Sequence, residues 1–378
     1  MRVEEVRENP WEDILTTASR VLVVVVAVAF FLLAIDLIGY SFVGLRQQIG
    51  ELILSVAANP FVGLFIGLLL TAVIQSSSTS TSMIVALVGS GAISLSTAVP
   101  IVMGANVGTT LTSTVVSLGF ITSRREFRKA ISAATVHDFY NIFLVAILFP
   151  LEYHYQVLSR LSHGLVEWLA DGWTDRATEG WSAELNLSHK VAQQIAEAIG
   201  NDWWLFLLSF ALLFAAIKVI SQIISHSLIG GSRERLNEHL FRNPYRSFLW
   251  GGALTAAVQS SSITTSLIVP LVAKGKVSLQ KAFPFVMGAN TGTTLTALLA
   301  AGLASRAAVE LAVVHLLFNV FGACLFLPYR PVREWPGRVA AFFGKLTLRR
   351  RIYGFLYVFL LFFAIPFLLI YCYRQGLL

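Results

Sequence analysis

Two short polar motifs lie within apolar sequence and carry the residues of this chain best suited to chemistry. They are Gln75, Ser76, Ser77 and Ser78, and Gln259, Ser260, Ser261 and Ser262. Hydroxyl and amide hydrogens can donate to the oxygens of phosphate or sulfate, above all beside the N-terminus of a helix. Oxygens of the same side chains can ligate a small hard cation. The motifs therefore predict an anion and a cation bound side by side, each lowering the desolvation cost of the other.

Both motifs belong to a long internal repeat. Residues 71–112 and 255–296 align without a gap and are identical at 27 of 42 positions. The identities fall on polar and small residues, whereas unrelated membrane helices would match mainly at Leu and Val. Repeated polar segments in a membrane protein indicate a substrate site shared between its two halves.

Composition indicates an all-α, polytopic membrane protein. The chain of 378 residues is 56% hydrophobic and 13% charged, which is far from the average of soluble domains. The first 20 residues lack the pattern of a cleaved signal peptide. Cys324 and Cys372 suggest neither a disulfide framework nor a metal site. Apolar runs of bilayer-spanning length occur near 21–45, 125–150, 203–228, 306–327 and 353–373.

Each repeat is predicted to begin with a re-entrant helical hairpin. The apolar stretch 59–74 would be about 24 Å long as a helix, too short for a hydrocarbon core of about 30 Å. It ends at the first serine motif and is followed by a second short apolar stretch, 83–93. The other copy has the same pattern at 244–258 and 263–273. Two half-length helices that meet at a polar turn enter and leave on one side of the membrane.

A broken transmembrane helix is predicted to follow each hairpin. Glycine, asparagine and threonine interrupt the next apolar segment at 104–110 (GANVGTT) and at 288–294 (GANTGTT). Irregular backbone at membrane depth is tolerated only where protein buries it or where it lines a cavity. Both blocks are therefore predicted to be unwound and to belong to the site.

A full helix completes each repeat. The repeats align again at His137 with His315 and at Asn141 with Asn319, once a loop is allowed to differ by six residues. A His four residues before an Asn lies on the same helix face, so these pairs can be structural or can belong to the site. Asp138 lies near the middle of its helix, where a carboxylate is a functional candidate and a structural ion pair is the alternative.

The two repeats are predicted to be inverted. Three full crossings, 97–119, 125–150 and 203–228, separate the hairpins, so the second hairpin must enter from the opposite side. Inverted repeats underlie alternating access in many secondary transporters.

Charge predicts a plasma (inner) membrane protein whose N-terminus is cytoplasmic. Segments on the N-terminal side contain 21 Lys and Arg, against 6 on the other side, and cytoplasmic loops are the basic ones. The net charge of +7 is therefore attributed to these loops and not to nucleic-acid binding. The chain divides into 1–58 (N-terminal segment and first transmembrane helix), 59–151 (first transport repeat), 152–202 (extracytoplasmic loop), 203–327 (linking helix and second transport repeat) and 328–378 (cytoplasmic loop and C-terminal helix).

The doubled pattern resembles the type II sodium-dependent phosphate cotransporter family, in a compact bacterial form. Two QSSS motifs, each followed by GAN-x-GTT, and the sequence TVHDFYN in the first copy carry the resemblance, which covers about 60–327. It implies a symporter of sodium ions and inorganic phosphate, the latter as divalent hydrogen phosphate. Lipid, phosphate and sodium are the implied partners, and the oligomeric state stays open.

The resemblance also implies roles for individual residues. All eight residues of the two serine motifs would hold phosphate. The family's Gln-x-x-Asp segment reads FITS at 120–123, which leaves the third sodium site and the stoichiometry open. Asp138 matches an aspartate of the electrogenic members. Sodium ligands would come from Gln259, Ser260, Asn290, Thr293 and Thr296 in the second repeat, and from Asn106, Thr109, Asp138 and Asn141 in the first.

Two other classes of protein stay open on the residues alone. An intramembrane serine hydrolase could pair one motif serine with His137, but it would need a single competent serine, whereas this chain has the polar motif twice. A channel could line a pore with the repeats, although the sequence has no ring of charge and no filter-like run of carbonyls. The duplication favours a transporter over both.

Overall fold

The computed structural model describes residues 59–173, 190–228, 240–302 and 305–377, and scattered positions between 19 and 41. Within these ranges the chain is helical and forms no strand. Predictions for 1–18, 42–58, 174–189 and 229–239 fall outside the described residues. Four described stretches are long and apolar enough to cross a membrane, Leu95–Leu118, Arg124–Tyr155, Arg306–Phe326 and Ile352–Arg374. The prediction of an all-α polytopic membrane protein is thereby confirmed.

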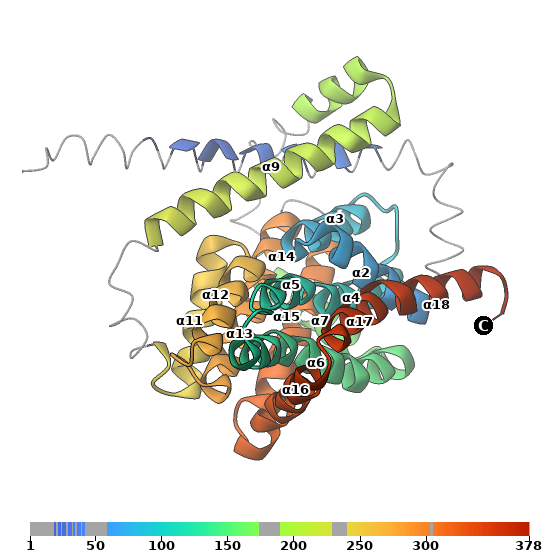
Figure 1. Ribbon diagram of the computed structural model, residues 1–378. Helices are drawn as coiled ribbons and strands as arrows, with labels where there is room; N and C mark the ends of the chain where they lie inside the picture. Colours follow the sequence, from blue (N-terminus) through green and yellow to red (C-terminus); the bar gives the residue numbers. More distant parts are fainter. Residues whose placement is uncertain are drawn as a thin grey trace, which may run out of the picture.

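The first repeat comprises five helices at the centre of the molecule (Figure 1). They are α2 (Pro60–Ile74), α3 (Ser77–Gly89), α4 (Leu95–Gly108), α5 (Leu111–Leu118) and α6 (Arg124–Tyr155). α2 and α3 form a hairpin, α4 and α5 are two parts of one interrupted helix, and α6 is a single long helix.

The second repeat contains the same five helices in the same order. They are α11 (Pro244–Val258), α12 (Ser261–Ala273), α13 (Leu279–Gly292), α14 (Thr294–Ala301) and α15 (Arg306–Phe326). From the hairpin through the interrupted helix, equivalent residues are 184 positions apart, so that Gln75 corresponds to Gln259.

Local sequence determines the shape of both hairpins. Asn59 and Asn243 cap the first helix of each, accepting hydrogen bonds from backbone N–H groups at 2.9 and 2.7 Å, and a proline follows each cap. Gln75 and Gln259 end these helices in the left-handed conformation, with φ of 56° and 55°. Non-glycine residues rarely adopt it. Its occurrence at equivalent positions makes the bend a shared feature of the two repeats.

Glycines of the blocks predicted to be unwound lie instead in regular helix. A Cβ added to Gly104 on α4 would lie 1.8 Å from the carbonyl oxygen of Leu64 on α2, and one added to Gly288 on α13 would lie 1.8 Å from that of Phe248 on α11. The glycines therefore allow α2 to pack on α4, and α11 on α13, with their backbones in contact. Close helix packing, and not unwinding, accounts for their presence.

The interruption of each helix is correspondingly short. Thr109 and Thr110 separate α4 from α5, and Thr293 separates α13 from α14. All three residues keep right-handed helical dihedrals. Thr110 N donates to the carbonyl oxygen three residues earlier, at 3.2 Å, so the turn is tightened and not opened. The prediction that 104–110 and 288–294 are unwound is therefore wrong: one or two residues interrupt each helix, and they keep helical dihedrals.

Several described helices lie outside the repeats. α16 packs along α6, and α17 continues into α18 through a π-helical turn, η1 (Figure 1). Pro366 follows this turn; since proline has no N–H, the carbonyl of Phe362 loses its helical partner and the ladder shifts locally. The bounds are α7 (Val157–Trp173), α9 (Asp202–Leu228), α16 (Arg330–Arg349), α17 (Ile352–Phe359), η1 (Leu360–Ala364) and α18 (Ile365–Arg374).

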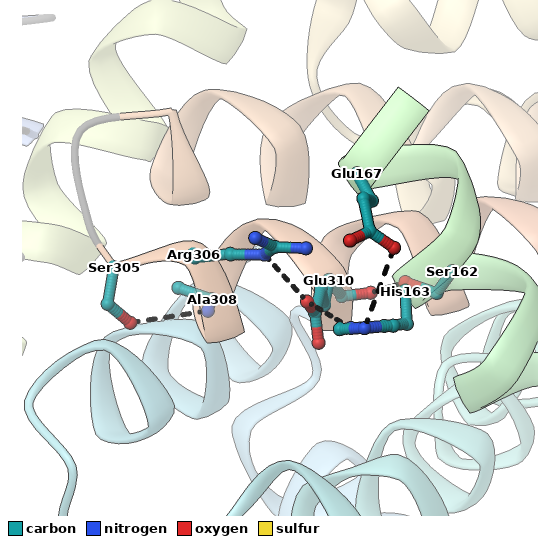
Figure 2. Close-up of polar contacts among 7 residues, drawn as sticks. All are labelled: Ser162, His163, Glu167, Ser305, Arg306, Ala308 and Glu310. Carbon is teal, nitrogen blue, oxygen red and sulfur yellow. Dashed lines mark hydrogen bonds and ion pairs between the residues drawn. The ribbon is translucent and has the colours of Figure 1, made fainter. Parts of the chain in front are cut away.

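α7 belongs to the predicted extracytoplasmic loop and lies against α15 (Figure 2). Ser162 Oγ donates to the carbonyl oxygen of Glu310 at 2.6 Å. The Glu310 carboxylate lies 3.0 Å from His163 Nδ1 and 3.3 Å from Arg306 Nε. The Glu310 side chain is 10% exposed, whereas both of its partners are more than half exposed. Part of the segment between the repeats is therefore a helix attached to the second repeat.

Candidate functional site

The two serine motifs meet between the repeats. Ser77 begins α3 and Ser261 begins α12, and their Oγ atoms lie 3.2 Å apart. Ser78 Oγ donates to the carbonyl oxygen of Gln259 at 3.0 Å. Residues that are 184 positions apart in the sequence are thus in direct contact, through the tips of the two hairpins.

The N-termini of α3 and α12 converge at this contact. Ser76 and Ser260 cap these helices, each Oγ accepting a hydrogen bond at 3.3 Å from the N–H three residues later. Other N–H groups of the first turns have no acceptor within their own helix. Each terminus also carries a partial positive charge. Two such termini in contact repel each other unless an anion lies beside both, so the geometry favours an oxyanion here.

The motifs combine buried and accessible groups. Ser77, Ser78 and Ser261 are buried, Gln75 is exposed, and the other four motif residues are partly exposed. The buried hydroxyls hold the tips together, whereas the glutamines and the capping serines remain accessible to an ion.

Predicted cation ligands of the second repeat adjoin the serine contact. Thr296 Oγ1 lies 3.5 Å from Ser78 Oγ, which in turn binds the carbonyl of Gln259. These neutral oxygens come from both repeats and are of the type that suits a small hard cation. Thr293 and Thr109 are buried at the two helix breaks, where each hydroxyl donates to the carbonyl oxygen four residues earlier, at 3.2 and 2.8 Å.

The asparagine candidates form a buried hydrogen-bond network between the repeats. Asn141 Nδ2 donates to the backbone oxygen of Asn106 at 2.9 Å. Asn290 Nδ2 donates to Oδ1 of Asn141 at 3.0 Å and to Oδ1 of Asn319 at 2.6 Å. His315 Nε2 lies 3.2 Å from Asn106 Oδ1. The amides thus bind one another, and their first effect is to join the two repeats.

The two paired histidines have different surroundings. Neither ring nitrogen of the buried His137 has a hydrogen-bond partner in the part of the chain that the structure describes. His315 reaches across to Asn106 on the other repeat. Asn319 Nδ2 donates to the backbone oxygen of His315 and not to its ring. The expected side-chain pairing of His with Asn on one helix face is therefore not the arrangement at 315 and 319.

Asp138 lies in a separate, fully buried position. Its carboxylate accepts hydrogen bonds from Thr114 Oγ1 at 3.2 Å and from Tyr357 Oη at 2.8 Å. No hydrogen bond links it to the serine motifs within the described residues. Tyr357 was missed in the sequence because it lies on α17, outside both repeats, so that no duplicated pattern marks it.

Buried hydroxyls without partners recur at equivalent positions of the repeats. Within the described ranges, the Oγ1 atoms of Thr71 and Thr255, one turn before the hairpin tips, have no hydrogen-bond partner. The same holds for the Oγ atoms of Ser82 and Ser266 on the second hairpin helices. Each pair is 184 residues apart. Buried polar groups usually have hydrogen-bond partners, so a symmetric set without them indicates an interior built for polar ligands or water.

Comparison with known proteins gives one family. A profile described as Na+/Pi-cotransporter matches residues 16–163 and 212–349. Sodium-dependent phosphate transport protein 2A of Ovis aries is 31% identical over 82% of this chain and 61% of its own length. The 2A protein of Oryctolagus cuniculus is 29% identical over 96% of this chain and 69% of its own length.

The 2B protein of Homo sapiens is 29% identical over 89% of this chain and 63% of its own length. The chain therefore spans between three fifths and seven tenths of the length of these relatives. No solved structure matches the chain.

Proposed function

The chain belongs to the Na+/Pi-cotransporter family, and from this premise we propose that it imports inorganic phosphate together with sodium ions across the plasma (inner) membrane. The observation that carries the proposal is the contact between the tips of two equivalent hairpins, Ser77 against Ser261 at 3.2 Å. It brings two positive helix termini to one point, where a phosphate dianion would offset their repulsion.

Phosphate would bind at the two serine motifs. Backbone N–H groups of the first turns of α3 and α12 offer donors that need no buried arginine. The accessible glutamine amides and capping hydroxyls add further donors. The proposed ligands are Gln75, Ser76, Ser77 and Ser78, and Gln259, Ser260, Ser261 and Ser262.

Sodium would bind beside the phosphate, on the side of the second repeat. The Ser78 hydroxyl, the Gln259 carbonyl and the Thr296 hydroxyl already lie together there. An adjacent anion and cation lower each other's desolvation cost, which couples their transport. The proposed ligands are Gln259, Ser260, Asn290, Thr293 and Thr296; Asn106, Thr109 and Asn141 form the related region of the first repeat, and Asp138 is a second, separate sodium position.

Alternating access would follow from two inverted repeats. The equivalence of α2–α6 with α11–α15 supports two halves of one design, and an odd number of crossings between the hairpins would invert the second half. We further propose that the N-terminus and the basic segments 120–129, 229–249, 274–281 and 328–352 lie on the cytoplasmic side. The proposed division of the chain is the one predicted from its sequence, with repeats within 59–151 and 203–327.

A serine hydrolase has less support. Such an enzyme needs a base within hydrogen-bond reach of its serine, and neither ring nitrogen of His137 is hydrogen-bonded to a motif serine within the described residues. The family, moreover, is one of cotransporters.

Uptake by purified protein in proteoliposomes tests the proposal. We expect radioactive phosphate to accumulate above equilibrium when an inward sodium gradient is imposed, and not when lithium or choline replaces sodium. Dissipating the sodium gradient should abolish accumulation. Downhill phosphate flux alone would indicate a channel, and release of a hydrolysis product without uptake would indicate an enzyme.

A further inference from the structure

Two adjoining hollows lie where α16 faces the second repeat and α6, and no residue of the serine motifs lines either of them. The first has a volume of about 480 Å³ and the second one of about 400 Å³. They share walls at Leu279, Gln280 and Ala341. α13 begins at this shared wall, so its N-terminus adds partial positive charge to both.

Basic side chains dominate the first hollow. Arg242, Lys281, Arg330, Arg333 and Arg338 line it, and the acidic lining consists of Glu334. That carboxylate is shared between two of the arginines, lying 2.7 Å from Arg330 Nε and 3.0 Å from Arg338 Nη2. Both hydrogen bonds hold the pKa of Glu334 below its usual range.

Among the described residues, the remaining positive charges of this hollow have no acidic partner. Arg333 Nη1 donates to the backbone oxygen of Leu327 at 2.6 Å, which orients the guanidinium without neutralising it. Arg242 and Lys281 are exposed and form no ion pair with any described residue. The hollow therefore holds fixed positive charge in excess and is suited to an anion.

The second hollow continues the same charge. Arg128, Lys129 and Lys345 line it, and none of its lining residues is acidic. These side chains come from α6 and α16, whereas Lys281 of the first hollow comes from α13. Basic side chains of α6, α13 and α16 thus surround the two adjoining hollows, which together form one recess.

An apolar, outward-facing surface adjoins this recess. On α11, Tyr245, Leu249 and Trp250 are 54, 65 and 49% exposed, directly beside the first hollow at Pro244 and Ser247. Exposed aromatic side chains at the end of a membrane helix are typical of the lipid headgroup level. A ligand in the recess could therefore place its charge among the arginines and lysines and its apolar part along α11.

We propose that the recess binds the phosphate-bearing headgroup of an anionic phospholipid. Basic pockets between membrane helices suit such headgroups, because each Lys or Arg near the surface attracts the anionic lipid. A soluble phosphate would use the same charges, but nothing would then occupy the apolar face of α11. This lipid site shares no residue with the serine motifs and does not depend on the proposed transport function.

Native mass spectrometry of the purified full-length protein tests the lipid site. The probes are dioleoylphosphatidylglycerol and dioleoylphosphatidylcholine, titrated separately. Arg242→Gln with Lys281→Gln should weaken phosphatidylglycerol binding by about thirtyfold and leave phosphatidylcholine binding unchanged. Lys274→Gln with Lys276→Gln is the matched control: it removes the same charge from exposed loop residues that line neither hollow, and it should bind phosphatidylglycerol normally.

Three results would overturn the lipid site. One is equal loss of phosphatidylglycerol binding in both double variants, which would indicate diffuse surface charge. Another is displacement of the lipid by millimolar glycerol 1-phosphate or inorganic phosphate, which would indicate a site for a soluble anion. The last is unchanged phosphatidylglycerol binding in both variants of the recess, Arg242→Gln with Lys281→Gln and Lys129→Gln with Lys345→Gln.

Discussion

The three serines of each motif have different contacts, although their side chains are identical. The first, Ser76 or Ser260, caps its helix, and the second, Ser77 or Ser261, meets its counterpart. The third differs between repeats, because Ser78 reaches the opposite repeat whereas Ser262 is partly exposed. The two equivalent motifs thus form one asymmetric group of oxygens. It consists of the Ser78 hydroxyl, the Gln259 carbonyl and the neighbouring Thr296 hydroxyl.

This asymmetry predicts unequal effects of one substitution at equivalent threonines. Thr296→Ala removes the hydroxyl beside Ser78 and should raise the sodium concentration for half-maximal phosphate uptake by about five- to tenfold, since losing one neutral ligand costs about 1 kcal/mol. Thr112→Ala, at the equivalent position of the first repeat, is the control and should change it less than twofold. Equal effects of the two variants would contradict the assignment of the cation to the second repeat.

Asp138 gives a second prediction for single residues. Tyr357→Phe removes the 2.8 Å hydrogen bond to its carboxylate, and we expect about fivefold weaker sodium activation of uptake, because hydrogen bonds to charged groups contribute about 1 kcal/mol or more. Tyr353→Phe, one turn earlier on α17, is the control. In an Asp138→Asn background the effect of Tyr357→Phe should disappear. If it persists there, Tyr357 acts on packing and not on the carboxylate.

At the scale of helices, glycine shows what a single sequence can and cannot predict. The positions of the hairpins and the repeat register followed from polar identities 184 residues apart. The predicted helix breaks at 104–110 and 288–294 are too long, because glycine, asparagine and threonine are typical both of unwound helix and of close helix packing. Only the partner helix distinguishes these cases: the Leu64 carbonyl lies where a Gly104 side chain would be, and a contact between α2 and α4 leaves no periodic signal in α4 alone.

The packing assignment predicts a large effect of one added methyl group. Gly104→Ala would place a Cβ 1.8 Å from backbone oxygen, which neither helix can relieve by a rotamer change, so we expect a loss of about 3 kcal/mol or failure to fold. The measurement is the thermal midpoint of the detergent-solubilised protein by size-exclusion chromatography. Gly164→Ala, which meets nothing within 4 Å, should stay within about 0.5 kcal/mol of the parent. A normal midpoint for Gly104→Ala would restore unwinding as the reason for the glycine.

The attachment of α7 to α15 gives a prediction for a helix pair. Glu310→Gln weakens the contacts to His163 and Arg306 while keeping the shape of the side chain, and it should lower stability by about 1 kcal/mol. Limited proteolysis within the segment between the repeats should accelerate. Glu167→Gln is the control and should have no measurable effect, because the Glu167 side chain is 59% exposed and its carboxylate lies 3.9 Å from His163 Nε2. Equal proteolysis of both variants would show that apolar packing alone holds α7.

For the whole molecule, the duplication in the sequence predicts that the two hairpin tips meet. No sequence pattern predicts where the C-terminal helices pack. Two equivalent halves with polar tips are expected to place them at a common interface, and both helix termini are found there. α16 and α17 have no counterpart in the repeats, so their contacts with α6 and with Asp138 could be found only in three dimensions. The proposed transport by alternating access would require that this common interface change while each repeat keeps its internal glycine-packed pairs.

Locking the tips together should therefore stop transport. With Cys324 and Cys372 replaced by Ser, Ser77→Cys and Ser261→Cys would bring two thiols to positions where hydroxyl oxygens are 3.2 Å apart, within reach of a disulfide. We expect mild oxidation to reduce sodium-driven phosphate uptake at least tenfold in proteoliposomes and a reductant to restore it. Each single-cysteine variant, treated identically, should keep its own activity. Mass spectrometry verifies that the disulfide has formed. Full uptake by the cross-linked protein would contradict the proposal, because a rigid link across the proposed site would then be compatible with every step of the cycle. The two tips would in that case move as one unit, and access would alternate through another interface.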